Sequence, residues 1–179
     1  MEISRSYPSP LGLLTLVSDG ASLTGLRFSS EKPCRTSAEP DTFPLFRETA
    51  LWLDAYFSGD QPAVSSLPLL PRGTRFHTEM WSMLCEIPYG TTVTYGELAK
   101  EAARRMQKAQ MSAQAIGGAV GQNPIPVIIP CHRVVGANRN LTGYSGGIDK
   151  KIRLLRLEGI SLSGFSLPGK RERIPEDIT

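Results

Sequence analysis

A stretch rich in proline and serine, residues 60–73, separates two parts of this 179-residue chain that carry different hydrophobic patterns. It contains three prolines and two serines, a composition typical of a connection between domains. The chain is long enough for two small hydrophobic cores. We therefore predict a first domain over residues 1–72, a second over 73–165, and a flexible tail over 166–179.

The first part combines strand-like segments with one helical segment. Residues 11–18 and 23–29 are rich in β-forming residues, and the turn between them contains Asp19 and Gly20, which predicts a hairpin. Residues 45–57 carry apolar side chains at helical spacing. We expect a small domain of strands and a helix.

The second part has mainly helical patterns, over residues 74–87, 94–106 and 112–121. Thr94 is followed three residues later by Glu97, which is the pattern of a capping box at a helix start. The last two helices are short and follow one another in the chain. Together they indicate a helix-turn-helix.

Two adjacent glycines lie inside the second of these helices. Gly117 and Gly118 each cost about 0.5–1 kcal/mol relative to alanine in a helix interior, so a close approach of some kind must favour them. One interpretation is tight packing against another helix. The other is entry of the helix backbone into a narrow nucleic-acid groove, such as the minor groove, which is about 6 Å wide.

Basic residues are concentrated in the second part. Residues 90–151 carry eight Lys/Arg and three Asp/Glu, whereas residues 1–89 carry seven and ten. This favours a polyanionic partner, although a solvated surface can carry the same pattern. No apolar run approaches the roughly 18 residues of a membrane span, and the N-terminus lacks the pattern of a secretory signal. We expect no membrane association and a cytoplasmic location, or a nuclear one in a eukaryote.

The three cysteines, Cys34, Cys85 and Cys131, are odd in number and far apart, so a disulfide framework is not expected. With only two histidines and no CxxC pair, a four-ligand zinc site is poorly supported. We expect no metal and no cofactor. Cys34 lies in a polar segment and is expected to be exposed, whereas Cys85 lies beside apolar residues and is expected in the core; His77 is expected to be a helix-start residue.

The most distinctive passage is IPVIIPCHRVVG over residues 125–136, in which a β-like apolar run ends at Cys131 and His132. Thiol chemistry needs thiolate, and a cysteine with a pKa of about 8.5 supplies little of it at neutral pH. A neighbouring imidazole that accepts the proton would raise that fraction, and a fixed backbone at Pro130 would help.

A histidine base is usually oriented by a carboxylate, and Asp149, Glu158 and Glu97 are all available. The alternative is a buried structural cysteine that happens to precede a histidine. Neighbouring residues on a strand point to opposite faces, so adjacency alone does not pair the two side chains. From the residues alone, both interpretations stay open.

The passage NPIPVIIPCHRVVG from Asn123, followed by GYSGG at residues 143–147, closely resembles the active-site motif of the O6-alkylguanine-DNA alkyltransferases. The resemblance extends from PYGTTVTYGELA at Pro88 to LEG at Gly159 and is weaker in the N-terminal part. It implies an α/β (α+β) fold class: a ribonuclease H-like N-terminal domain of strands plus a helix, then a mainly helical winged helix-turn-helix domain that carries the active-site cysteine.

The resemblance also implies a role for each matching residue. Cys131 would accept the alkyl group, His132 would be its base through a water, and Glu158 would orient the histidine. Asn123 would tie the recognition helix to the active-site strand, and Tyr95 would help to rotate the nucleotide out of the duplex and offer its hydroxyl to guanine. The implied alkylguanine pocket is formed by Tyr95, the carbonyls of Cys131 and Val134, Tyr144 and the N–H of Ser145. The implied DNA-contacting residues are Thr94, Tyr95, Gly96, Gln114, Ala115 and Gly118.

One position departs from the family pattern. Members commonly place an arginine two residues before the Ile/Val-Gly-Gly step, where it fills the space left by the extruded base, and this chain has Gln114 there. We expect weaker DNA affinity or slower base extrusion than in an arginine-bearing relative. The basic residues Arg104, Arg105 and Lys108 in the preceding loop are candidates for phosphate contacts or for a solvated surface.

The implied function is direct-reversal DNA repair by a monomer. It would transfer an alkyl group irreversibly, once per molecule, from O6 of guanine in double-stranded DNA to Cys131. It would bind the duplex through the minor groove and flip the nucleotide, with O4 of thymine as a further candidate position. Two rival functions are a lesion-binding protein that recruits other repair factors and a cysteine hydrolase that turns over.

Overall fold

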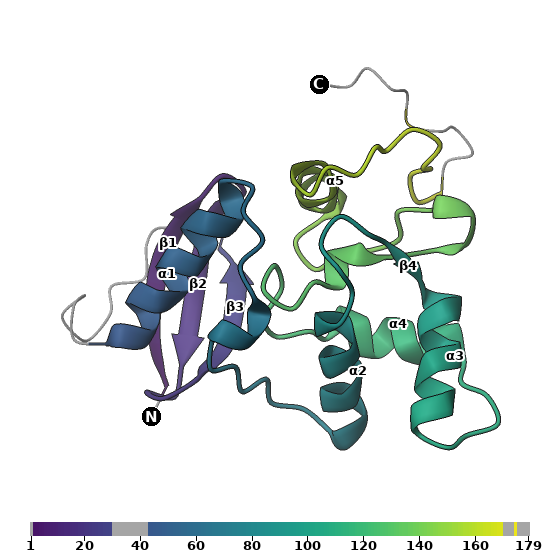
Figure 1. Ribbon diagram of the computed structural model, residues 1–179, viewed down its shortest axis with the longest axis horizontal. Helices are drawn as coiled ribbons and strands as arrows, with labels where there is room; N and C mark the ends of the chain where they lie inside the picture. Colours follow the sequence, from purple (N-terminus) through teal and green to yellow (C-terminus); the bar gives the residue numbers. More distant parts are fainter. Residues whose placement is uncertain (1, 30–42, 170–173, 175–179) are drawn as a thin grey trace. The chain divides into compact units, whose positions relative to one another are not determined.

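The computed structural model describes residues 2–29, 43–169 and 174. It divides into two compact units (Figure 1). Unit 1 comprises Met1–Gly73 together with Pro124–Ile128, and unit 2 comprises Thr74–Asn123 and Ile129–Thr179. The assignment of the five residues Pro124–Ile128 to the first unit was not predicted. Cys34 lies outside the described residues.

Unit 1 is built on an antiparallel three-stranded sheet with the strand order β1-β2-β3. Its elements are β1 (Ile3–Ser9), β2 (Gly12–Ser18), β3 (Leu23–Phe28), α1 (Pro44–Phe57) and the short 3-10 helix η1 (Val64–Ser66). The predicted hairpin and helix are present, whereas β1 was not predicted. Leu14, Leu16 and Leu53 have no exposed surface and form part of the core of this unit. The turn between β2 and β3 is held by Asp19, whose Oδ1 accepts hydrogen bonds from the N–H groups of Ala21 and Ser22.

Strand β3 also contacts the returning segment Pro124–Ile128. The N–H of Leu26 donates to the carbonyl of Pro124 at 2.8 Å. A Cβ on the neighbouring Gly25 would lie 3.7 Å from the Pro124 carbonyl oxygen, an ordinary contact, and 3.3 Å from Cβ of Val17, which is tight. The segment therefore packs on the edge of the sheet in unit 1.

Unit 2 is mainly helical. Its elements are α2 (Arg75–Cys85), β4 (Val93–Thr94), α3 (Tyr95–Arg105), α4 (Ala113–Gly121), the 3-10 helix η2 (Cys131–Arg133), β5 (Val134–Val135), the 3-10 helix η3 (Ala137–Arg139) and α5 (Ile148–Leu157). β4 and β5 form a parallel pair. Helix α5 was not predicted. Within the described residues, no helix combines the length and the apolar character needed to cross a bilayer.

The ends of the helices follow the predicted capping chemistry. The Thr94 side chain accepts from the N–H of Glu97 while the Glu97 carboxylate accepts from the N–H of Thr94, so the capping box of α3 is confirmed. Ser112 caps α4 through the N–H of Ala115. The indole N–H of Trp81 on α2 donates to the carbonyl of Ala119 at 2.9 Å and fixes α4 against α2. Helices α3 and α4 thus form the predicted tandem pair.

The strand-like run before Cys131 is not a strand, and this prediction was wrong. Pro126 and Pro130 have no N–H to donate to a ladder, and Val127 has a positive φ of 75°. Ile128 is fully buried, so the apolar character of the run reflects burial of an irregular segment rather than membership of a sheet. Cys131 begins a turn of 3-10 helix.

The segment after α5 is also packed where it is described. Ser166 and Leu141 share a backbone hydrogen bond of 2.8 Å, and Ile174 is 8% exposed with its N–H bonded to the carbonyl of Phe165. The prediction of a flexible tail from residue 166 is therefore wrong for Ser166 and Ile174, which make these contacts in unit 2.

Candidate active site

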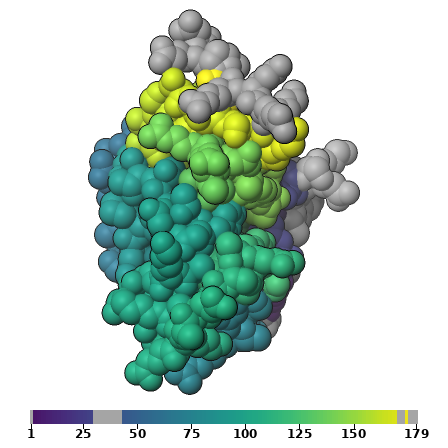
Figure 2. All heavy atoms as spheres, turned by 90° about the vertical axis from the view of Figure 1, so that its right-hand side faces the viewer, coloured from purple at the N-terminus to yellow at the C-terminus, as the bar shows by residue number. Residues whose placement is uncertain are grey.

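A cleft of about 650 Å³ opens in unit 2 between helices α3 and α4 and the loop 136–145. Figure 2 shows unit 2, coloured teal to yellow, in space-filling form. The cleft is lined by Tyr95, Gly96, Ala113, Gln114, Gly117, Gly121, Gly136, Ala137, Thr142, Gly143, Tyr144 and Ser145. Five of the predicted residues, Tyr95, Gly96, Gln114, Tyr144 and Ser145, thus share one cavity. Gly136, Ala137 and Thr142 were not predicted.

Cys131 is buried, with 5% of its surface exposed; it is not among the residues that line the cavity, but it lies close enough to Tyr95, which does line it, to affect the pKa of that residue. Burial raises the pKa of its thiol to about 11, while a hydrogen bond from Asn123 and the positive charge of Lys151 oppose that rise. The thiol is therefore protonated in the resting protein. This corrects the expectation that its surroundings raise the thiolate fraction at rest, because loss of hydration outweighs the favourable partners.

His132 and Glu158 form a buried pair, with Nε2 of the histidine 2.7 Å from Oε1 of the carboxylate. Burial lowers the pKa of His132, although Glu158 partly offsets this. The imidazole is therefore neutral at neutral pH. Since the carboxylate only accepts, we assign the proton to Nε2, which leaves Nδ1 as the nitrogen with an acceptor lone pair.

The carboxylate of Glu158 is fixed by four hydrogen bonds. Besides the one from His132, it accepts from Nε and Nη2 of Arg133, each at 2.9 Å, and from the N–H of Gly90 at 3.2 Å. Burial alone would raise the pKa of Glu158, but the hydrogen bonds from His132 and Arg133 outweigh burial and hold it at about 2. The carboxylate is therefore ionised and cannot rotate without losing charged donors.

The other two candidate carboxylates serve the helices on which they lie. Glu97 closes the capping box of α3, and Asp149 lies in the first turn of α5, where a negative charge is favourable. Of the three carboxylates that the sequence left open, Glu158 is the one in contact with His132.

Arg133 was not predicted as a site residue, although it lies next to His132. It is 7% exposed, and its guanidinium donates to the carbonyl of Ile87 at 2.6 Å and lies 5.6 Å from the centre of the Tyr89 ring. Arg133 thus connects Glu158 with the turn before β4. The sequence did contain a signal for this role: Arg133 is a basic residue in a largely apolar run, and a charge that is buried with such a run needs a charged partner.

Lys151 was not predicted either. It has no exposed surface, and its ammonium donates to the carbonyls of Val134 at 2.6 Å and Thr142 at 2.9 Å. Burial lowers the pKa of Lys151 to about 8. The spacing of Lys151 with Leu154 and Leu155 on one face of α5 was the available signal. The resemblance implies that the Val134 carbonyl accepts a hydrogen bond from the guanine amine. This carbonyl already accepts from Lys151, and its second lone pair is left for another donor.

Asn123 connects the end of α4 with the chain before Cys131. Its Nδ2 donates to the carbonyl of Ile129 at 2.8 Å, and its side chain is buried. The expected tie is present, but it joins the helix to an irregular turn rather than to a strand.

The DNA-contacting residues predicted on α4 lie on its exposed face. Gln114, Ala115 and Gly118 are exposed. A Cβ on Gly118 would meet nothing within 4 Å, whereas one on Gly117 would lie 3.8 Å from the Tyr95 ring, an ordinary contact. Internal helix packing therefore does not explain Gly118.

The basic residues at the end of α3 are largely paired with carboxylates. Arg105 contacts Glu86 at 2.6 Å and Glu101 at 2.7 Å, and Arg104 contacts Glu101 at 2.6 Å. These pairs leave the arginines less available to phosphate than the sequence indicates. Within the part of the chain that the structure describes, no three His, Cys, Asp or Glu side chains lie close enough together to hold a metal ion.

Comparison with known proteins gives consistent matches for both units. Two family models match: the 6-O-methylguanine DNA methyltransferase ribonuclease-like domain over residues 3–71, and the DNA binding domain of the same family over residues 75–160. A protein from Haemophilus influenzae named methylated-DNA–protein-cysteine methyltransferase is 44% identical over 156 residues, which are 86% of this chain and 84% of the relative. A protein of that name from Mycobacterium bovis is 41% identical over 177 residues, 98% of this chain and 96% of the relative.

Solved structures match over both units as well. The crystal structure of Mycobacterium tuberculosis OGT in complex with DNA has a TM-score of 0.72 and 42% identity, covering 87% of this chain and 91% of that chain. The crystal structure of the Mycobacterium tuberculosis O6-methylguanine methyltransferase has a TM-score of 0.72 and 39% identity, covering 88% of this chain and 93% of that chain.

Proposed function

We infer the function of this chain from its family: it belongs to the 6-O-methylguanine DNA methyltransferases. It is a methylated-DNA–protein-cysteine methyltransferase and acts in DNA repair. We propose that Cys131 is the residue that accepts the alkyl group from O6 of guanine. The observation that carries this assignment is that the buried Cys131 directly precedes His132, which is paired with Glu158, and lies close enough to Tyr95, a residue that lines a cleft large enough for a base, to affect its pKa.

The proposed reaction is a displacement at carbon. The guanine is rotated out of the duplex into the cleft, at a cost of a few kcal/mol, because the alkyl carbon bonded to O6 is out of reach of the thiol while the base is stacked. The Cys131 proton passes through a water to Nδ1 of the neutral His132, and the sulfur forms a bond to the alkyl carbon as the carbon–O6 bond breaks. The electron pair of that bond goes to guanine, where hydrogen bonds from Tyr95 and the Ser145 N–H stabilise it.

The raised pKa of the thiol fits this order of events. A thiol that is protonated at rest is a weak nucleophile towards other electrophiles, and in the proposed step its proton passes to His132 as the sulfur attacks. The thioether that forms has no leaving group that the chain could activate again. We therefore propose one transfer per molecule, without a cofactor.

The finer features of the proposal concern the partner. We propose that the protein acts as a monomer in the cytoplasm, or in the nucleus of a eukaryote, and that α4 enters the minor groove of alkylated double-stranded DNA. The exposure of Gln114, Ala115 and Gly118 supports this side of α4 as the binding face. O4 of thymine is a candidate second position.

Intact-protein mass spectrometry after incubation with a duplex that contains O6-methylguanine tests the proposal. We expect each chain to gain the mass of one CH₂ group, located on Cys131 by peptide mapping, and the number of repaired lesions to equal the number of chains. A protein that shifts the DNA without a mass change would instead be a lesion binder. An unmodified protein that clears many lesions would be a hydrolase.

Gly118→Ala should change stability and DNA affinity in opposite directions. Alanine is the better helix former and meets no atom within 4 Å, so we expect the free energy of unfolding to rise by about 0.5–1 kcal/mol. The added methyl group would obstruct the groove, and we expect binding to a methylated duplex to weaken about tenfold. Urea unfolding and fluorescence anisotropy measure the two quantities.

Glu48→Ala on α1 is the matched control, because Glu48 is also an exposed helical position and lies in unit 1. It should leave DNA affinity unchanged. If Gly118→Ala binds the duplex as tightly as the wild type, α4 does not approach DNA closely at this position.

A further inference from the structure

One face of the loop 136–145 lines the cleft, and its other face contacts the segment that follows α5. Gly136, Ala137 and the residues from Thr142 to Ser145 line the cavity. This loop is therefore the wall that faces α4 across the space in which an alkylated base would lie. Its position decides how much room is left for the alkyl group.

The segment that follows α5 pairs with this loop through its backbone. The N–H of Ser166 donates to the carbonyl of Arg139 at 3.1 Å, and the N–H of Leu141 donates to the carbonyl of Ser166 at 2.8 Å. The side chain of Asn140 adds a hydrogen bond to Oγ of Ser166 at 3.0 Å. Three consecutive residues of the loop are thus bound to one residue of the C-terminal segment.

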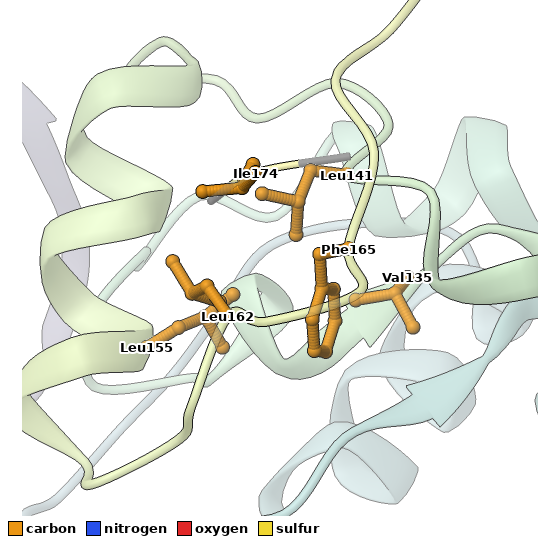
Figure 3. Close-up of a cluster of buried hydrophobic side chains, with 6 residues drawn as sticks. All are labelled: Val135, Leu141, Leu155, Leu162, Phe165 and Ile174. Carbon is orange, nitrogen blue, oxygen red and sulfur yellow. The ribbon is translucent and has the colours of Figure 1, made fainter. Parts of the chain in front are cut away.

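A cluster of buried side chains supports the same contact. Its members, all at most 8% exposed, are Val135, Leu141, Leu155, Leu162, Phe165 and Ile174. Figure 3 shows the Phe165 ring beside Val135 and Leu141, the residues that flank the turn of the loop. The cluster therefore joins β5, the loop, α5 and the C-terminal segment into one packed body.

The turn of the loop needs such support. Asn138 and Arg139 both have positive φ, 55° and 58°, a conformation that residues other than glycine seldom adopt. The Arg139 guanidinium lies 5.6 Å from the centre of the Phe165 ring. Phe165 thus contacts the turn as well as the cluster.

We propose that the C-terminal segment Leu162–Leu167 sets the size of the alkyl group that the cleft accepts, by holding the loop 136–145 in place. This inference rests on the proposed alkyl transfer. Both family models end at or before residue 160, so the segment lies outside the residues they match. When the loop is firmly held, it positions a methyl group for attack and excludes a bulky alkyl group. When the loop is loosened, it positions the methyl group less well and admits bulky groups more easily.

The test compares single-turnover rates on two duplexes, one with O6-methylguanine and one with O6-benzylguanine. In Phe165→Ala we expect the methyl rate to fall while the benzyl rate falls less or rises, so that the benzyl-to-methyl ratio increases about tenfold. Phe165→Leu, which keeps an apolar side chain in the cluster, should restore most of the wild-type ratio. A ratio unchanged in Phe165→Ala would overturn the inference.

Phe46→Ala is the matched control, because Phe46 is a 2% exposed phenylalanine in the core of unit 1. It should lower stability and leave the ratio as in the wild type; an equal change of ratio would mean that stability alone is responsible and would overturn the inference. If Phe165→Ala does not fold, a chain truncated after Gly169, which lacks Ile174, provides the same comparison. Absence of any transfer by the wild type would instead refute the proposed function.

Discussion

Cys131→Ser should bind a duplex that contains O6-methylguanine as the wild type does and should transfer no methyl group. Serine is close in size to cysteine, so the cavity and the His132–Glu158 pair stay in place. Its hydroxyl is a much weaker nucleophile, and His132 is too weak a base to ionise it before attack. We expect the transfer rate to fall by a factor on the order of 10⁴ or more. Mass spectrometry of the protein and anisotropy of the labelled duplex measure the two effects.

Cys85→Ser is the control for this experiment. Cys85 is half-buried, and burial raises the pKa of its thiol to about 11, the same value as for Cys131. The charges that act on it are those of Arg133 and Glu86, and it does not line the cleft, so we expect its replacement to leave the transfer rate unchanged. Repair by Cys131→Ser, or repair of several lesions by one wild-type molecule, would contradict the assignment of Cys131.

The comparison of the two thiols concerns why we propose Cys131 rather than Cys85 as the acceptor. Their pKa values are equally raised, so the ionisation of the resting thiol does not distinguish them. The difference lies in their neighbours. The Cys131 thiol interacts with the Asn123 side chain and with the Lys151 charge, and the next residue in the chain is His132, whose imidazole is held by Glu158. The sequence pattern indicates Cys131 because a neighbouring histidine was expected to lower the pKa of the thiol. In the structure, burial raises that pKa instead.

Local features of the fold were predictable because they depend on residues three or four positions apart. The Thr94–Glu97 capping box and the Ser112 cap of α4 involve side chains and backbone of one helical turn. These caps fix where α3 and α4 begin, and thereby where Tyr95 and Gln114 lie at the cleft. The helix-turn-helix could therefore be recognised from the sequence.

Non-local features were not predictable from pattern alone. Glu158 lies 26 residues from His132 in the chain, and nothing in the spacing distinguishes it from Asp149 or Glu97. The resemblance selected Glu158, and the contact is found in the structure. Lys151 is buried by the packing of α5. Its spacing with Leu154 and Leu155 places it on the same face of the helix, but lysine is usually exposed, so that spacing alone does not predict its burial.

The run before Cys131 shows the limit of apolar patterns. A short apolar segment is consistent with a strand or with any other buried chain, and periodicity does not separate the two. Here Asn123 binds Ile129, and Pro124 accepts from Leu26, so that the segment is held in an irregular path from both of its ends. Such a path depends on tertiary contacts that the sequence does not display.

Glu158→Gln should have the second largest effect on transfer, and it should also lower stability. A glutamine has the same shape, but its amide nitrogen must take the place of one carboxylate oxygen and would face donors from His132 and Arg133 or from Gly90 and Arg133. The Arg133 charge would also lose its buried counter-ion. We expect a loss of about 3–5 kcal/mol in the free energy of unfolding. We expect the single-turnover rate to fall about 10²–10⁴-fold, because the imidazole loses its orientation.

The pH dependence of this loss separates an ionised Glu158 from a merely well-packed one. Its pKa is lowered from 4.5 to about 2 in the folded protein, so the stabilisation is fully present above about pH 4.5 and is lost as the pH falls towards 2. The difference in unfolding free energy between wild type and Glu158→Gln should therefore be constant from pH 6 to 8 and shrink below about pH 4.5. Asp149→Asn, which removes an exposed carboxylate on α5, should cost at most about 1 kcal/mol. A difference that stays the same down to about pH 2.5 in urea unfolding would mean that the carboxylate charge does not hold Arg133 and His132 together.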